Sequence, residues 1–188
     1  MPDLEPITAL GSNAPRSLSS GSLTLEENAA LALASVSLRR NAPKPSPFGL
    51  DLPGPGGWTG SQGVSAFWTG PGQWMIEGHH RADSDFAVEV ATSCPGCSVT
   101  EQTDGFAAFE IRSSMGEKPI LRLMEKLVNI DASRLSAGSA TRTGLEHMSV
   151  FVIRRAPDRV AVLGMRSAAG SIWHALEVAI LRLNAAAA

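Results

Sequence analysis

Both cysteines of the chain lie in one short stretch, Cys94-Pro-Gly-Cys97, and this spacing is the first place to look for chemistry. Proline followed by glycine is the preferred central pair of a type II turn, which brings the first and fourth residues close together. Two thiols held in this way could bind a metal ion or form a redox pair. The same geometry also suits a plain turn flanked by two structural thiols.

The surrounding residues give little support to either chemical alternative. A closed zinc site needs four ligands, and the other plausible ligands nearby are His79 and His80, whose side chains point to opposite faces of a strand. A thioredoxin-type pair needs a helix that begins at its first cysteine, whereas the Ser-Val-Thr after Cys97 favours a strand. We therefore favour free structural thiols and keep zinc binding and a redox pair as alternatives.

Histidines and carboxylates elsewhere stand in no recognisable motif. His147 sits at the entry of a predicted strand and His174 lies on the last predicted helix, and neither has a carboxylate partner placed by the sequence, so we expect surface or structural histidines. Glu101 and Asp104 could bring two carboxylates together, but a glycine after Asp104 favours a solvated turn. Neither G-x-S-x-G nor G-x-G-x-x-G occurs. We predict no catalytic, cofactor-binding or metal-binding residue.

The positions of the four tryptophans indicate which rings lie in the core and which could contact a partner. Trp58 lies among prolines and glycines, where a core position is not expected, so that either a partner covers its ring or the ring is tucked under its own loop. Trp68, Trp74 and Trp173 lie on predicted strands or on the last helix, and we expect them in the core.

The elements that must position these residues follow from periodicity and turn residues. Alternation predicts strands at the end of "LTLEENAALALASVSLRR" (33–38), in a hairpin at 64–69 and 73–77, and twice in "SVTEQTDGFAAFEIRS". "TRTGLEHMSVFVIRRAPDRVAVLGM" predicts one long strand, a turn at 156–158 and a return strand. Helical spacing predicts three helices, in "ADSDFAVEVATS", "EKPILRLMEKLVNI" and "SAAGSIWHALEVAILRL". The order is ββα, ββα, ββα, an α+β fold with antiparallel hairpins covered by helices.

Two segments carry few signals of regular structure. Residues 1–21 are rich in serine, proline and glycine, which predicts an extended arm that lies against something else. Residues 41–60 contain five prolines and predict a long connector. We therefore divide the chain into an arm at 1–21 and a single α+β domain at 22–188.

Composition excludes several classes of function. The net charge is −2 and no run of five or more like charges occurs, so a nucleic-acid-binding surface is not expected. The longest apolar stretches fall well short of the roughly 20 residues of a membrane span. The acidic, proline-broken N-terminus does not resemble a secretory signal. We expect a soluble, cytoplasmic protein that binds neither nucleic acid nor membrane.

Several sequence blocks, in order and spacing, resemble the gamma subunit of heterotetrameric sarcosine oxidase. They are "ITALGS", "LTLEENAALALASVSLRR", "LPGPG", "FWTGPGQWMIE", "SVTEQTDGFAAFEI", "MEKLVNIDASRL", "ATRTGLEHMSVFVIRR" and "VAVLGMRSAAGSIWHAL", which together cover nearly the whole chain. This family is similar in turn to the folate-binding domain of the glycine-cleavage aminomethyltransferase. The resemblance thus implies an α+β fold with a duplicated module.

The resemblance also implies a subunit and not a complete enzyme. It implies alpha, beta and delta subunits as partners, in a complex that oxidises sarcosine to glycine and passes the one-carbon unit to tetrahydrofolate. FAD, FMN, NAD, tetrahydrofolate and zinc would lie in those partners, and this chain would be mainly structural. A stand-alone folate-binding or one-carbon-transfer module, and a small zinc or thiol protein at Cys94 and Cys97, remain as alternatives.

Overall fold

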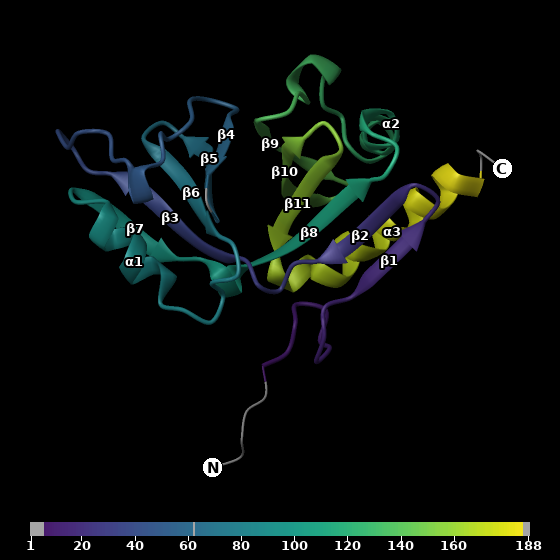
Figure 1. Cartoon of the computed structure of the whole chain (residues 1–188), viewed down its shortest axis with the longest axis horizontal. Helices are drawn as coiled ribbons and strands as arrows, with labels where there is room; N and C mark the ends of the chain where they lie inside the picture. The colour runs from purple at the N-terminus through teal and green to yellow at the C-terminus, as the bar shows by residue number, and fades with distance from the viewer. Residues whose placement is uncertain (1–5, 62, 186–188) are drawn as a thin grey trace, which may run out of the picture.

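The computed structural model describes residues 6–61 and 63–185 (Figure 1). Within them lie three α-helices, α1 (Phe86–Ser93), α2 (Glu117–Leu127) and α3 (Ala169–Ala185). The strands of these residues are β1 (Ser17–Ser20), β2 (Leu23–Glu27), β3 (Ala32–Leu38), β4 (Trp58–Ser61), β5 (Val64–Gly70), β6 (Gln73–Gly78), β7 (Cys97–Glu101), β8 (Phe106–Ser113), β9 (Ser139–Leu145), β10 (Met148–Ala156) and β11 (Arg159–Met165). None of the described helices is long and apolar enough to cross a membrane.

The strands form two antiparallel sheets. Sheet A has the order β1-β2-β8-β11-β10-β9, and sheet B has the order β4-β5-β6-β3-β7. In Figure 1 the two sheets converge at the lower centre and diverge toward the top, while helices lie on their outer sides. An isolated bridge between Gly57 and Ser139 joins the residue before β4 to the first residue of β9.

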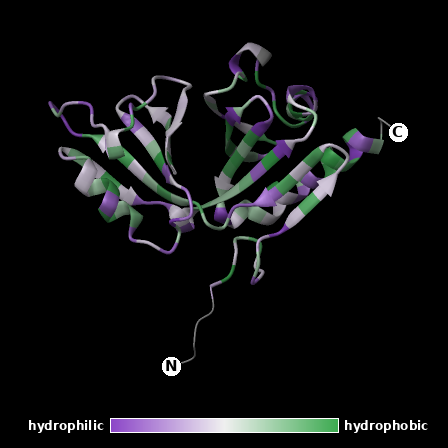
Figure 2. Ribbon diagram, viewed as in Figure 1, coloured by the Kyte–Doolittle hydropathy of each residue, from purple (hydrophilic) through white to green (hydrophobic). Residues whose placement is uncertain are grey.

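Three apolar clusters lie between four layers, which are α1, sheet B, sheet A, and the pair of helices α2 and α3. Successive residues of a strand face opposite sides, so each sheet contributes side chains to a cluster on both of its faces. Phe86 and Val90 of α1 pack on the outer face of sheet B, and α2 and α3 pack on the outer face of sheet A. The third cluster lies between the sheets and includes Leu33, Phe67 and Ile153. Both faces of each sheet are therefore covered, and consecutive residues of β6, β8 and β11 are buried; Figure 2 shows hydrophobic residues along the strands of both sheets.

The main expectations from periodicity are confirmed. The strand at 33–38, the hairpin of β5 and β6, the three helices and the paired strands β10 and β11 all form. The turn between β5 and β6 contains Gly72 with φ of 67°, a backbone conformation that glycine adopts without strain. The α+β class with antiparallel sheets and covering helices is therefore correct.

Several details differ from the expectations. The long strand is two strands, β9 and β10, joined at Glu146 and His147, because Glu146 adopts a φ of 52° that ends the first strand. The segment "LTLEE" forms β2, in which Leu23 and Leu25 face the α-helical side with the buried Glu27, while Thr24 and Glu26 face away. β7 and β8 do not pair with each other but belong to different sheets. The last part of the predicted arm forms β1 against β2, and residues 1–5 lie outside the described residues.

The contact between α1 and β6 generates a stability prediction. A Cβ at Gly78 would lie 2.6 Å from Cε2 of the fully buried Phe86 ring, so that Gly78→Ala overpacks the outer core of sheet B. We expect a loss of about 1–3 kcal/mol in the free energy of unfolding, measured by urea denaturation. Gly54→Ala, where nothing lies within 4 Å of the new Cβ, is the matched control, and equal stabilities of the two variants would contradict this packing.

Candidate functional site

The two cysteines occupy a tight turn between α1 and β7. Cys94 caps the C-terminal end of α1, Cys97 begins β7, and the Cys97 N–H donates to the Cys94 carbonyl at 3.2 Å. Gly96 has a φ of 82°, which is the conformation that the third position of a type II turn requires. The predicted turn geometry is therefore confirmed.

The environment of these thiols does not favour reactive thiolates. Cys94 is buried with the core between α1 and sheet B, and Cys97 is partly buried. Burial raises the pKa of both thiols. Cys94 lies at the C-terminal end of a helix, whereas a helix N-terminus would stabilise a thiolate. Across residues 6–61 and 63–185, no group of three or more His, Cys, Asp or Glu side chains is arranged to hold a metal ion.

The other polar residues singled out from the sequence lie apart from one another. His147, in the turn between β9 and β10, and His174, on α3, are both exposed, as expected. The Glu101 carboxylate accepts hydrogen bonds from Thr103 and from backbone N–H groups, and these bonds hold its pKa below the usual value against a partial desolvation. Asp104 lies 3.7 Å from Arg166 instead of facing Glu101. The solvated-turn interpretation of these two carboxylates is confirmed.

The tryptophan at the end of the connector has a role that the sequence did not reveal. The Trp58 indole N–H donates to Glu77 Oε2 at 2.9 Å, and its partly buried ring packs against the cluster between the sheets. Trp58 is therefore tucked into its own chain beside a carboxylate. Trp74 and Trp173 are buried as expected, and Trp68 is partly buried against the outer core of sheet B.

Glu77 belongs to a buried ion network that links the two sheets. Arg155 of β10 donates both terminal nitrogens to the two oxygens of Glu77 on β6, at 2.8 Å each. The Arg155 Nε donates to Glu110 of β8 at 3.0 Å. Glu77 is fully buried, and the side chains of Arg155 and Glu110 are 8% and 12% exposed. One guanidinium thus holds three strands of two sheets in a fixed arrangement.

The charges in this network are stabilised by their partners. Burial alone would raise the pKa of Glu77, but Arg155 and the hydrogen bonds from Arg155, Ser65 and Trp58 outweigh it, so that the pKa lies below its usual value. Ser65 Oγ also lies 3.1 Å from His79 Nε2. Burial, with the nearby Arg155 cation, lowers the pKa of His79. Because Ser65 already donates to Glu77, the Ser, His and Glu do not form a nucleophile–base arrangement.

One local feature of the sequence, a pair of adjacent arginines, indicates this network, although hydrophobic periodicity does not. Two adjacent arginines, Arg154 and Arg155, end an otherwise apolar strand, and neighbours on a strand point to opposite faces. Arg154 is accordingly buried on the helical side, where it pairs with Glu117 of α2 at 2.9 Å and donates to the Leu135 carbonyl. Arginines on both faces of a central strand require buried acceptors on both sides.

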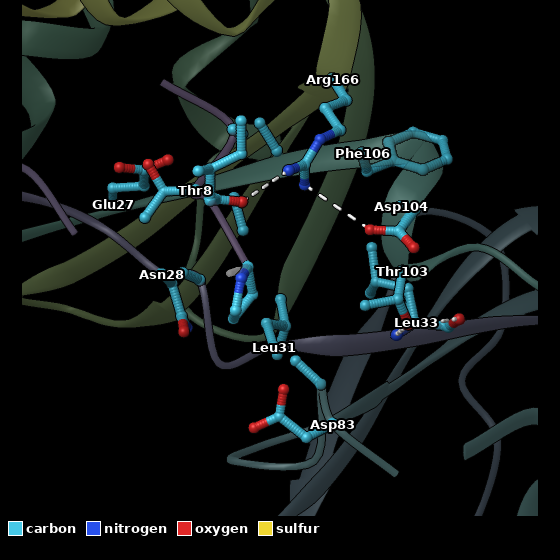
Figure 3. A pocket seen from close by; sticks show the side chains of 17 residues that line it. Thr8, Glu27, Asn28, Leu31, Leu33, Asp83, Thr103, Asp104, Phe106 and Arg166 are labelled. Carbon is cyan, nitrogen blue, oxygen red and sulfur yellow. Dashed lines mark hydrogen bonds and ion pairs between the residues drawn. The ribbon is translucent and has the colours of Figure 1, made fainter. Parts of the chain in front are cut away.

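Two small cavities share Glu27 and Asn28 in their linings. One, of about 140 Å³, is covered by the N-terminal segment where the sheets converge (Figure 3). Arg166 closes it by donating to the Ile7 carbonyl at 3.0 Å and pairing with Asp104 (Figure 3). The other, of about 260 Å³, is lined by His79, His80 and the charged residues of sheet A, including Arg155. Within the described residues, neither cavity brings together a nucleophile, a base and an orienting group.

The layered arrangement defines an aminomethyltransferase-like α+β fold, and two solved structures share it. A chain of the heterotetrameric sarcosine oxidase from Corynebacterium sp. U-96, solved in complex with pyrrole 2-carboxylate, superposes with a TM-score of 0.68 at 14% identity, over 88% of each chain. The glycine cleavage system aminomethyltransferase T from Bartonella henselae superposes with a TM-score of 0.53 at 12% identity, over 80% of this chain and 44% of that one. No protein-family model and no curated protein sequence matches the chain.

These likenesses confirm the fold that the sequence resemblance implied. At such identities they establish the fold alone. The chain spans less than half the length of the aminomethyltransferase but most of the sarcosine oxidase chain. The described residues provide two antiparallel sheets that a buried ion network joins.

The buried network generates a pH-dependent prediction. Arg155→Met leaves Glu77 buried without its cation, and we expect a loss of about 3–5 kcal/mol in the free energy of unfolding at neutral pH. In the parent chain the lowered pKa of Glu77 contributes stability above the ordinary glutamate pKa of 4.5, and this contribution is lost as the pH falls through the folded-state pKa. In the variant, burial raises the pKa of Glu77, so lowering the pH protonates this carboxylate and removes the cost of burying an unpaired charge.

The difference in stability between the parent chain and Arg155→Met should therefore shrink as the pH is lowered toward 4.5. Urea denaturation across this range measures it. Arg159→Met, at a half-exposed arginine of the next strand, is the control and should change stability little at any pH. A variant as stable as the control would show that Arg155 does not hold the buried carboxylate.

The burial of the two thiols predicts their reactivity. We expect Cys97 to react slowly with a thiol reagent in the native chain and Cys94 to react only after unfolding, because Cys94 is 2% exposed and both pKa values are raised. Absorbance with a disulfide reagent, followed by peptide mass spectrometry, separates the two. Stoichiometric zinc uptake that protects both thiols would instead support the zinc alternative.

Proposed function

We propose that this chain is a noncatalytic subunit of a sarcosine oxidase-type complex, in the position of a gamma subunit. The observation that carries the proposal is the fold match over 88% of both chains to a chain of a heterotetrameric sarcosine oxidase. The block resemblance in the sequence points to the same subunit.

In this proposal the chemistry belongs to other chains. The alpha, beta and delta subunits would carry FAD, FMN, NAD, tetrahydrofolate and zinc, and the complex would act in the cytoplasm on sarcosine. This chain would supply a preformed surface. Its two sheets are fixed to each other by Arg155 and by the apolar layer between them, so little conformational freedom is lost on assembly.

A second candidate function is a stand-alone folate-binding or one-carbon-transfer module. The observation in its favour is the fold shared with an aminomethyltransferase, together with a cavity of about 580 Å³ beside Trp68 and Phe151. Cavities of this size accept small molecules. Titration of the isolated chain with tetrahydrofolate, followed by tryptophan fluorescence, separates this candidate from the first.

Purification of the tagged chain from its native cells tests the proposal. We expect three further chains in the eluate, a flavin absorption spectrum and oxygen uptake that depends on sarcosine. The untagged strain, treated in the same way, is the control for nonspecific retention. A colourless chain that elutes alone would reject the proposal and leave only the likeness of fold.

A further inference from the structure

The cavity of about 580 Å³ lies where β9 meets the connector before β4. Its apolar wall is made by the partly buried rings of Trp68 and Phe151, and Gly56 and Thr141 line it beside them. Because this volume exceeds that of a few water molecules, the cavity accommodates a large side chain.

The charges that line this cavity have one sign. Arg134 and Arg142 line it, and no acidic residue does. The Arg142 Nε donates to Ser149 Oγ at 2.9 Å, and the guanidinium carbon lies 5.9 Å from the centre of the Phe151 ring. In the described part of the chain no ion pair within 4.0 Å involves either arginine, although Arg134 lies close enough to Asp131 for the two charges to interact. Arg142 in particular remains available to a carboxylate from outside.

The edge of sheet A beside the cavity has unpaired backbone. β9 is the last strand of the sheet, and its outer side is bridged only at its two ends, by Gly57 opposite Ser139 and by Val128 opposite Leu145. The Ala140 N–H points outward to the Gly56 carbonyl at 2.8 Å. Since orientation alternates along a strand, the backbone N–H and C=O of Arg142 point outward as well, where the described residues offer no partner.

A second hollow continues along this edge. A cavity of about 370 Å³ is lined by residues 142–144 and 146–149 and shares Arg142 with the first. An unpaired strand edge is a template for an added strand, and pockets beside such an edge take alternate side chains of that strand. The site is therefore shaped for an extended chain and not for one compact molecule.

We propose that the outer edge of β9 around Arg142, with the adjoining cavity, docks an extended acidic segment of another subunit, which adds beside β9 and places a large apolar side chain against Trp68 and Phe151. The identity of the occupant follows from charge. A second copy of this chain paired antiparallel at Arg142 would bring two guanidinium groups together, which is unfavourable, whereas carboxylates pair with both arginines. This inference rests on the proposed function, because it assigns the segment to a partner subunit.

Charge reversal tests the site in the native complex. In the tagged chain, Arg134→Glu with Arg142→Glu should lower the retention of the partner chains by about tenfold or more, with a larger loss at low salt. Arg122→Glu with Arg182→Glu, at exposed arginines of α2 and α3, is the control of equal charge change and should retain the partners. Circular dichroism of each purified chain verifies that the variants are folded.

Chemical cross-linking identifies the occupant without destabilising the site. Arg142→Lys keeps the charge and allows a carbodiimide to join the new amine to a nearby carboxylate. We expect a cross-linked peptide from another subunit with Asp or Glu at the joined position, and none from Arg122→Lys. Amide hydrogen exchange in β9 should also slow on assembly, whereas that of β7, an edge strand of sheet B, should not change.

The outcomes separate the docking site from the proposed function. Partners retained equally by both double variants, with no cross-link from Arg142→Lys, would overturn the docking site and leave the subunit role intact. Failure of the parent chain to retain any flavin-containing partner would reject the subunit role, and the docking site with it. A homodimer of the isolated chain that the Arg134 and Arg142 changes dissociate would overturn the assignment of the occupant.

Discussion

The arrangement of the molecule depends on one buried guanidinium. Arg155 makes two hydrogen bonds to Glu77 of sheet B and others to Glu110 of sheet A, so the separation of the sheets at this point is set by a bidentate ion pair. Apolar packing alone tolerates sliding of one sheet over another, whereas a bidentate pair is satisfied in only one geometry. Ionic groups buried in this way add little net stability but select one arrangement of the chain. We regard this selection as the reason for placing charge between the sheets.

The layer between the sheets has a polar and an apolar part. Glu110 and Arg155 line a charged cavity together with His79. Phe67 and Phe151 belong to the apolar part, where their rings lie 5.0 Å apart, and Phe151 also lines the cavity of about 580 Å³ with Trp68. The connector returns Trp58 to the layer between the sheets, where its indole N–H donates a hydrogen bond to Glu77. Trp58 is thus one of several anchors of the proline-rich connector, beside the buried Leu50 and Leu52 and the hydrogen bond that the Trp74 indole N–H donates to the Pro53 carbonyl.

This architecture separates two structural properties of the chain. The outer layers of helices and the ion network give rigidity, while the edge of β9 keeps backbone groups and arginines available. Edge strands are usually protected by charge or by covering segments. Here the connector covers the start of β9 and the segment after α2 covers its end, so that only a short stretch is open. A short open edge limits nonspecific pairing and still permits a specific one.

The sequence by itself determined the local elements and the class of the fold. Alternation in β5, β6, β10 and β11, helical spacing in α1 to α3, and the Pro-Gly pair between Cys94 and Cys97 are local signals, and local backbone preferences decided them. The sequence also sufficed to expect exposed His147 and His174. Only the tertiary structure decided which strands pair, because β7 and β8 are adjacent in sequence yet belong to different sheets. It alone brought Glu77, Glu110 and Arg155 together, since contacts between residues far apart in the chain leave no periodic trace in it.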